Sequence, residues 1–290
     1  MLDQLDLLHA LAGLLVGLLV GMTGVGGGSL MTPLLVLMFG VSPQTAVGTD
    51  LLYAAMTKIT GTAVHGWRDT VDWKIVRRLA YGSVPATILT LAIIANLGKV
   101  SDRSQHIILF SLALLLAITA CTVIFRSRLA RFAKDRGPLE PTSRVTGATV
   151  VLGAAIGTAV SISSVGAGAI GVTILLMLYP RLPMVRIVGS DIAHAVPLAL
   201  IAGFGHWIIG DVDGTLLTNL LVGSIPGVIV GSLLSTRAPE RILRPLLAIV
   251  LALSSWQLFV KASSPAEAGA KSSASSATGT LAAPGNSGQK

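Results

Sequence analysis

The stretch TGVGGGSLMTP, residues 23–33, interrupts an apolar run that begins at Leu7. Its glycines crowd into five positions, as Gly24, Gly26, Gly27 and Gly28. Glycine weakens a helix and admits backbone angles that other residues avoid. Within a membrane, a broken helix is tolerated only where it is buried in protein or lines a watery cavity. We therefore expect a helix to break here, inside a larger helical assembly.

The residues that follow the glycines are suited to start a second helix. Ser29 is a suitable N-cap residue, and an apolar run continues from it to Phe39. A helix N-terminus presents free N–H groups and a partial positive charge, so it attracts anions. A weaker copy of the break, SSVGAGAIGVT, occupies residues 163–173. The chain is therefore expected to contain two broken helices, each with one end suited to an anion.

The composition indicates a membrane protein. Of 290 residues, 52% are hydrophobic and only 12% are charged, and the mean hydropathy is +0.79. A soluble domain carries about 25% charged residues. The net charge of +8 does not indicate nucleic-acid binding, because the basic residues gather in short connections, as in cytoplasmic loops of membrane proteins. We expect an all-α polytopic membrane protein, in contact with the lipid bilayer and without a nucleic-acid partner.

The apolar segments fall into two halves that we treat as domains. Residues 1–125 form an N-terminal membrane repeat, 126–144 a basic cytoplasmic loop, 145–261 a C-terminal membrane repeat and 262–290 a disordered Ser/Ala/Gly-rich tail. Segment 106–125 is the most uniformly apolar, and we expect it to face lipid. The expected helical segments are 7–22, 29–39, 45–65, 79–97 and 106–125, then 145–160, 168–179, 187–209, 215–235 and 245–260.

The two halves repeat one another in sequence. Several short motifs recur in the same order, which is unlikely by chance. The matched pairs are GLLVG 13–17 with GAAIG 153–157, VGTDL 47–51 with VGSDI 188–192, and GSVP 82–85 with GSIP 223–226.

The basic connections favour an inverted arrangement of the halves. If both segments at each break cross the membrane, the basic connections lie inside and DVDG, 211–214, lies outside. Each repeat then has about five segments, an odd number, so the halves are inverted, as in many secondary transporters. The alternative counts each broken pair as one element, which gives eight segments and parallel halves but loses the agreement with the charges.

The glycines admit two interpretations. Gly13, Gly17 and Gly21 recur every four residues, a spacing that serves close helix packing, as do Gly223, Gly227 and Gly231. The cluster at 24–28 could also be packing, but it holds more glycine than packing needs and has hydroxyl neighbours. In the second copy, the candidate substrate-binding residues are Ser163, Ser164, Gly166 and Gly168. We interpret both breaks as functional.

Two acids occupy matched positions in the repeat. Asp50 follows Thr49, and Asp191 follows Ser190, each near the expected start of a segment. Ionisable residues within a membrane are costly and commonly functional. The alternative is an N-cap role, because an aspartate in the first turn accepts hydrogen bonds from helix N–H groups. Both interpretations stay open.

Lys58 and His194 are the candidate anion-binding side chains. Lys58 lies in the middle of segment 45–65, too far from its ends for its charge to reach water readily. It could bind an anion or pair with an acid. His194 is one turn from Asp191 and could bind an anion, carry a proton or be a buried structural residue. His65 and His206 stand beside tryptophans near segment ends and are interpreted as interfacial anchors.

Motifs for catalysis and metal binding are missing from the sequence. GVGGGS lacks the Lys-Ser/Thr of a phosphate-binding loop, and neither HExxH nor a Cys/His cluster occurs. Asp50 and Asp191 could suggest an intramembrane aspartyl protease, but no Gly-x-Gly-Asp stretch surrounds them. We expect no enzyme activity, no cofactor and no metal.

The GxGGG…P stretch, the following VGTDL, the GSVP and the weaker repeat together resemble the TauE/SafE sulfite-exporter family, also called probable membrane transporter proteins. The resemblance covers about residues 7–260, and the second half departs from the pattern with GAGAIG. It implies a multi-pass protein of the bacterial inner membrane that transports a small anion, often sulfite or an organosulfonate.

The hypothesis from sequence is a secondary transporter of a small anion, with an anion channel and an intramembrane aspartyl enzyme as alternatives. Direction, coupling ion and oligomeric state stay open. The expected substrate-binding residues are Gly24, Gly26, Gly27, Gly28, Ser29, Thr49, Asp50, Lys58, Ser163, Ser164, Gly166, Gly168, Ser190, Asp191 and His194.

Overall fold

A computed structural model describes most of the chain. The described ranges are 6–23, 28–65, 71–97, 102–135, 143–166, 168–234 and 240–263, except for the side chains of 61–65, 97, 102–104, 126–127, 129–135, 240–242 and 244. The expected disordered tail, 262–290, lies outside these ranges from residue 264 onward.

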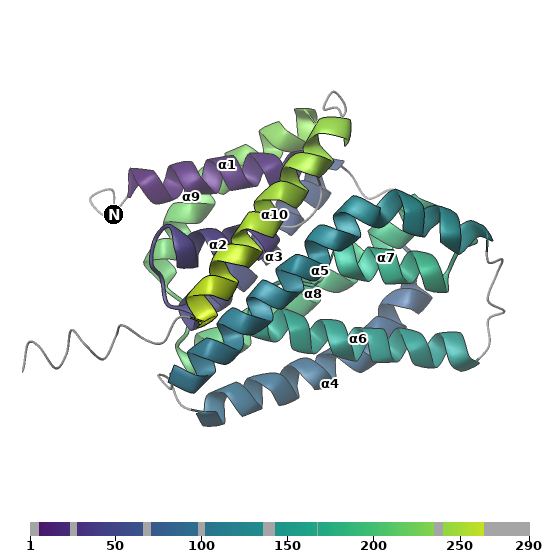
Figure 1. Ribbon diagram of the computed structural model, residues 1–290, viewed down its shortest axis with the longest axis horizontal. Coiled ribbons are helices and arrows are strands. Elements are labelled where there is room, and N and C mark those ends of the chain that lie inside the picture. Colours follow the sequence, from purple (N-terminus) through teal and green to yellow (C-terminus); the bar gives the residue numbers. More distant parts are fainter. Residues whose placement is uncertain are drawn as a thin grey trace, which may run out of the picture.

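Every regular element in the described ranges is a helix, which confirms the all-α class (Figure 1). Six of the helices, α4, α5, α6, α8, α9 and α10, are long and apolar enough to cross a membrane. The helices α1, α2 and α7 on either side of the two breaks are shorter. The bounds are α1 Leu7–Thr23, α2 Gly28–Leu37, α3 Pro43–His65, α4 Trp73–Leu97, α5 Asp102–Asp135, α6 Ser143–Ser163, α7 Ala169–Leu178, α8 Met184–Ile209, α9 Gly214–Leu234 and α10 Glu240–Ser263.

Some element boundaries differ from those expected. Helix α2 begins at Gly28, so Ser29 lies in its first turn and is not the N-cap. Helix α5 continues to Asp135, so the first part of the segment expected as a basic loop is helical. Charged residues are good helix formers, which lets a membrane helix extend beyond the bilayer.

The glycine stripe of α1 packs against α9, which confirms the packing interpretation. The methyl carbon of an alanine at Gly17 would lie 2.5 Å from the carbonyl oxygen of Ser224. Gly13 faces Leu220 one turn earlier, so α1 and α9 run parallel. Without side chains at these points, the two backbones can approach closely.

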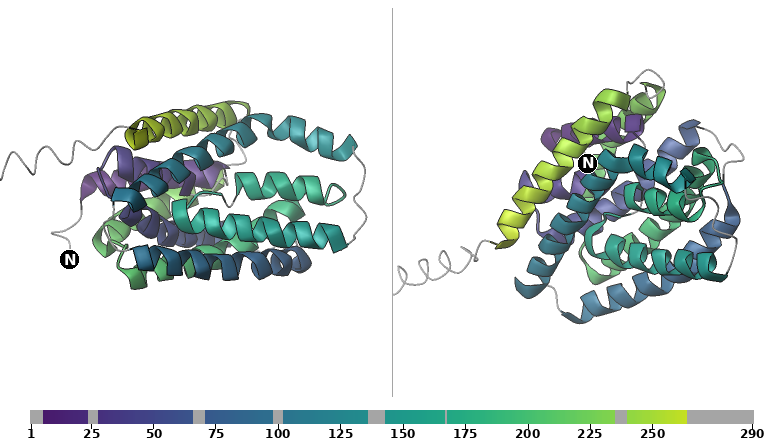
Figure 2. Two further views of the ribbon diagram at one scale, coloured as in Figure 1. Left: turned by 60° about the horizontal axis from the view of Figure 1, so that its bottom comes forward. Right: turned by 45° about the vertical axis from the view of Figure 1, so that its right-hand side comes forward.

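Helices α4 and α6 make the same kind of contact, but here the glycines lie on the helix from the second half, α6, and the partner α4 belongs to the first half. Gly153 of α6 faces Leu79 of α4, and Gly157 faces Ser83 one turn later. Each half thus contributes one helix to a parallel pair with the other half. Figure 1 shows α1 beside α9 and α4 beside α6, and Figure 2 shows the assembly from two further sides.

The helices at matched positions of the repeat are antiparallel. Gly203 of α8 faces Leu52 of α3. Gly48 lies one turn earlier in α3 but faces His206, which lies later in α8 than Gly203. Helices α5 and α10 behave alike, because the Ser255 hydroxyl donates to the Ala113 carbonyl and Phe110 lies beside Phe259. An inverted repeat requires antiparallel α3 and α8, whereas halves of the same orientation would place them parallel.

Helix α5 has a buried face, so the expectation that segment 106–125 faces lipid is only half right. Leu112 and Leu116 are fully buried, while Phe110, Leu114 and Ile118 are exposed. A segment that is apolar on all sides gives no signal in sequence for which side contacts protein.

Candidate functional site

The two breaks contact each other. Gly28, the first residue of α2, packs against Ser164, the residue that follows α6, and an alanine methyl carbon at Gly28 would lie 2.8 Å from the Ser164 hydroxyl. Ser164 has a φ of 58°, a backbone angle that is uncommon outside glycine. Gly166 and Gly168 follow with φ of 128° and 117°. Such backbone conformations cluster at functional sites.

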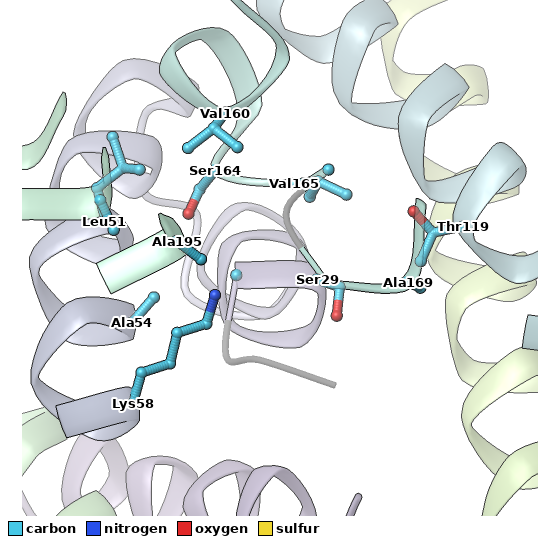
Figure 3. A pocket seen from close by; sticks show the side chains of 13 residues that line it. Ser29, Leu51, Ala54, Lys58, Thr119, Val160, Ser164, Val165, Ala169 and Ala195 are labelled. Atoms are coloured by element: carbon cyan, nitrogen blue, oxygen red, sulfur yellow. The ribbon is translucent and has the colours of Figure 1, made fainter. Parts of the chain in front are cut away.

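A pocket opens beside this contact, between α2, α3, α5, α7, α8 and the α6 break (Figure 3). Lys58 is the one charged side chain among its described lining residues, and Figure 3 shows its ammonium group extending into the space. The remaining lining residues are small, apolar or hydroxyl-bearing. Of the residues expected in the site, Gly28, Ser29, Lys58, Ser164 and Gly166 line this pocket.

Two aspartates lie within electrostatic range of Lys58. Asp50 and Asp191 both interact with its ammonium group, although neither lines the pocket. Each carboxyl group is almost fully buried, with 0% and 2% of the residue exposed. A buried carboxylate is costly unless it is paired or hydrogen-bonded, so a nearby ammonium group offsets that cost.

Both aspartates approach the start of a helix that follows a break. The Thr32 hydroxyl of α2 donates to Oδ2 of Asp50. An alanine methyl carbon at Gly171, in the first turn of α7, would lie 2.5 Å from Oδ1 of Asp191. Helix N-terminal turns attract negative charge. The matched acids therefore occupy equivalent places in the two halves, each beside a half-helix.

The N-cap interpretation of these aspartates is wrong. Helix α3 begins at Pro43 and α8 at Met184, so Asp50 and Asp191 each lie two turns inside their own helix. Their carboxyl groups face helices α2 and α7 instead. The sequence did not reveal this because both helices begin earlier than their apolar runs.

The hydroxyl residues next to the aspartates hold inter-helix connections. The Thr49 hydroxyl accepts from the Asp213 N–H at 3.1 Å, and the Ser190 hydroxyl accepts from the Asp72 N–H at 2.8 Å. Ser163 bonds to the backbone of Val165 inside the break. None of these three lines the pocket. Their hydrogen bonds hold neighbouring segments together near the pocket, but their side chains do not line it.

His194 also lies away from the pocket. Its Nε2 is 2.8 Å from the hydroxyl of Ser83 on α4. The matched residue in the first half is Tyr53, whose hydroxyl accepts from Ser224, the counterpart of Ser83, at 2.8 Å. Its other ring nitrogen, Nδ1, is buried and has no hydrogen-bond partner among the described residues, so the anion, proton and structural interpretations stay open.

Some expectations fall outside the described residues or fail. Gly24, Gly26 and Gly27 and the His65 side chain are not described. His206 is 1% exposed and bonds to Ser161 and Asp211, so its interpretation as an interfacial anchor is wrong. Thr119 of α5 lines the pocket and was missed, because a threonine in an apolar segment carries no distinguishing signal.

The fold and site define a multi-pass α-helical membrane protein with two contacting helix breaks and a lysine-lined pocket between its halves. Comparison with known proteins is consistent with that class. The chain belongs to the "Sulfite exporter TauE/SafE" family, whose profile matches residues 9–258. It is therefore a member of a family of membrane transporters, located in the bacterial inner membrane.

Curated relatives cover most of the chain. A "Probable membrane transporter protein YjnA" of Bacillus subtilis is 39% identical over 249 residues, which cover 86% of this chain and 97% of the relative. A "Probable membrane transporter protein" of Xylella fastidiosa is 27% identical, over 78% and 83% of the two chains. YdhB of Bacillus subtilis, with the same description, is 28% identical, over 79% and 90%. No solved structure matches significantly.

Proposed function

We propose that this protein is a secondary transporter that moves a small anion, sulfite or an organosulfonate, across the membrane. The observation that carries the proposal is the Lys58 ammonium group in a pocket bounded by the two helix breaks. Ser29 and Ser164 add hydroxyl groups to the same pocket. An ammonium group and hydroxyl donors can replace part of an anion's hydration shell.

The arrangement of the halves supports a transporter rather than an enzyme. Antiparallel α3 and α8, with one break contributed by each half, fit the inverted repeats of secondary transporters, whose sites lie at the repeat interface. Asp50 and Asp191 each face a different half-helix, whereas an aspartyl protease needs two carboxyl groups acting together on one water molecule. In this proposal the aspartates set the charge around Lys58 or bind protons.

The sulfonate or sulfite group suits this pocket because it combines negative charge with several acceptor oxygens. The Lys58 ammonium group and the hydroxyl groups of Ser29 and Ser164 are hydrogen-bond donors that reach the pocket from different segments. The apolar lining residues, such as Leu51 and Val160, would accept a short alkyl group. The same pocket offers little to a cation, since its one described lining charge is positive.

Transport measurements on the purified protein test the proposal. Proteoliposomes would be assayed for uptake of radiolabelled sulfite and methanesulfonate, with a proton gradient or with none, and against protein-free liposomes. We expect saturable uptake and concentration of at least one of the two anions above the external level. Uptake that only equilibrates would identify a channel, and uptake equal to that of protein-free liposomes for both anions would contradict the proposed substrates.

A further inference from the structure

His206 and Asp211 form a buried pair outside the pocket. The His206 ring, at the end of α8, is 1% exposed, and Asp211 is 6% exposed. The ring Nε2 is 2.8 Å from the carbonyl oxygen of Ser161, and Nδ1 is 3.3 Å from Oδ2 of Asp211. Both ring nitrogens therefore face oxygen atoms.

This geometry specifies a proton. A carbonyl oxygen only accepts hydrogen bonds, so Nε2 must carry a hydrogen atom to bond to Ser161. The contact between Nδ1 and Asp211 then needs a second hydrogen atom, either on the ring or on the carboxyl group. Both hydrogen bonds form when the pair carries one proton more than a neutral histidine and an ionised aspartate carry together. Without that proton, Nδ1 and the carboxylate present lone pairs to each other.

We propose that His206 and Asp211 bind the proton that is coupled to anion transport, at a site separate from the anion pocket. This inference rests on the proposed function. The pair is connected to the pocket through Ser161, which lies in the last turn of α6, three residues before Ser164. Loss of the proton leaves the bond from Nε2 to the Ser161 carbonyl in place and breaks the contact between Nδ1 and Asp211, which holds the ring in position beside the end of α6. That end leads directly into the break that lines the pocket.

The described groups that pack against the pair are mostly backbone and apolar side chains. Helix α3 presents Gly48, where a methyl carbon would lie 2.6 Å from the Asp211 carbonyl oxygen and 3.0 Å from the His206 Cβ. Helix α4 presents Leu91 against Gly205, and α6 presents the Ser161 carbonyl. The next acid in the connection is Asp213, whose carboxyl group accepts from the Leu216 N–H instead. Among the described residues, Asp211 is the charged partner recorded for the ring.

The position of the pair gives it a route to water. His206 stands in the last turn of α8, next to the connection that leads to α9. Asp211 opens the connection to α9, and Asp213 and Gly214 of that connection are exposed. With the basic connections inside the cell, this connection faces the outside. The proton would therefore enter from the outside and act on the pocket from the side opposite to the cytoplasm.

The test separates coupling from anion movement. Proteoliposomes carrying wild-type protein or the double variant His206→Gln/Asp211→Asn would be assayed with sulfite and with methanesulfonate. Methanesulfonate is included because its charge does not change with pH in this range. The variant side chains form neutral hydrogen bonds but do not titrate near neutral pH. One assay is uptake driven by a pH gradient of one unit, acidic outside. The other is counterflow exchange at equal pH, which needs no net proton movement. His106→Gln, an exposed histidine on α5, is the control.

We expect the wild type and His106→Gln to accumulate an anion up to about tenfold for coupling to one proton, since one pH unit is a tenfold concentration ratio worth about 1.4 kcal/mol. The double variant should exchange the anion but reach an accumulation ratio of about one. Gradient-driven accumulation by the double variant equal to that of the wild type would overturn the proton site alone. Loss of exchange together with accumulation would also overturn it, in favour of a structural role. A wild type inactive in both assays would contradict the proposed function, and the proton site with it.

Discussion

Lys58 breaks the symmetry of the repeat at the centre of the site. Its counterpart in the second half, in the register that matches VGTDL to VGSDI, is Ala199, and both residues line the pocket. The two halves thus supply similar scaffolds but only one ammonium group. Under the proposed function, the positive charge that an anion meets in the pocket therefore comes from the first half alone.

Replacing Lys58 with methionine should strongly reduce transport while the protein still inserts. Loss of a hydrogen bond to a charged group removes about 1.5–3 kcal/mol, so we expect uptake at low substrate concentration to fall about 10- to 100-fold. Proteoliposome uptake of sulfite and methanesulfonate at matched protein amount measures this. Lys74→Met, at an exposed lysine of α4, serves as the control. Near-normal uptake by Lys58→Met would assign the lysine to pairing with Asp50 and Asp191 alone.

At the scale of single residues, the sequence identified which side chains matter but not always what they contact. Lys58, Asp50 and Asp191 could be selected because ionisable residues are costly within a membrane. The pair of His206 and Asp211 escaped notice, because a histidine beside a tryptophan also suits an interface and only the fold brings Ser161 to the ring.

At the scale of helices, the contact between α1 and α9 should be intolerant of a single methyl group. Gly17→Ala places a carbon 2.5 Å from the Ser224 carbonyl oxygen, and backbone cannot move aside cheaply. We expect a loss of about 1–3 kcal/mol in the free energy of unfolding, as for other overpacked cores. Gly147→Ala in α6 has nothing within 4 Å of the added carbon and should cost nothing by packing. Thermal denaturation in detergent compares the two, and equal midpoints would contradict the close approach.

The contact between the two breaks should matter for transport more than for folding. Gly28→Ala adds a carbon that overlaps the Ser164 carbonyl and so displaces α2 from the end of α6. We expect uptake to drop about tenfold or more, since small displacements at a site are costly, with insertion retained. Uptake per inserted protein would be compared with that of Gly147→Ala. If Gly28→Ala transports as well as its control, the breaks do not form one site.

The existence and order of the helices followed from the apolar runs, but several helix ends did not, and α5 is much longer than expected. Helices α3 and α8 each begin before the apolar run, at Pro43 and Met184, because turn residues and a proline provide the first turn. These earlier starts, by two and three residues, place Asp50 and Asp191 well inside their helices, where they make inter-helix contacts and do not cap.

For the whole molecule, the proposed orientation places the connection after α8 outside and the start of α6 inside. Thr215→Cys and Ser143→Cys, both at exposed positions, report on these two sides once Cys121 is replaced. A membrane-impermeant thiol reagent should label Thr215→Cys in intact cells and label Ser143→Cys only after the cells are permeabilised. The reverse pattern would invert the orientation, and labelling of both in intact cells would exclude an inverted repeat of this form.

The matched motifs predicted that the chain repeats, and the basic connections predicted how the halves are oriented. Neither predicted that the halves exchange helices. The glycines of α1 and of α6 show the same spacing in sequence, and spacing does not name the partner helix. Only the contacts of Gly17 with Ser224 and of Gly157 with Ser83 reveal that each partner belongs to the other half.

This exchange has a consequence during synthesis. Helix α1 leaves the ribosome about 190 residues before its partner α9 begins, which at about 5–20 residues per second is a wait of roughly 10–40 s. Throughout that time its glycine face lacks the helix against which it packs in the folded protein. We therefore expect the N-terminal half not to reach its final packing by itself, because α1 and α4 both pack against helices of the second half. Expressed as two separate polypeptides cut within residues 136–142, the halves should be degraded singly and survive only together.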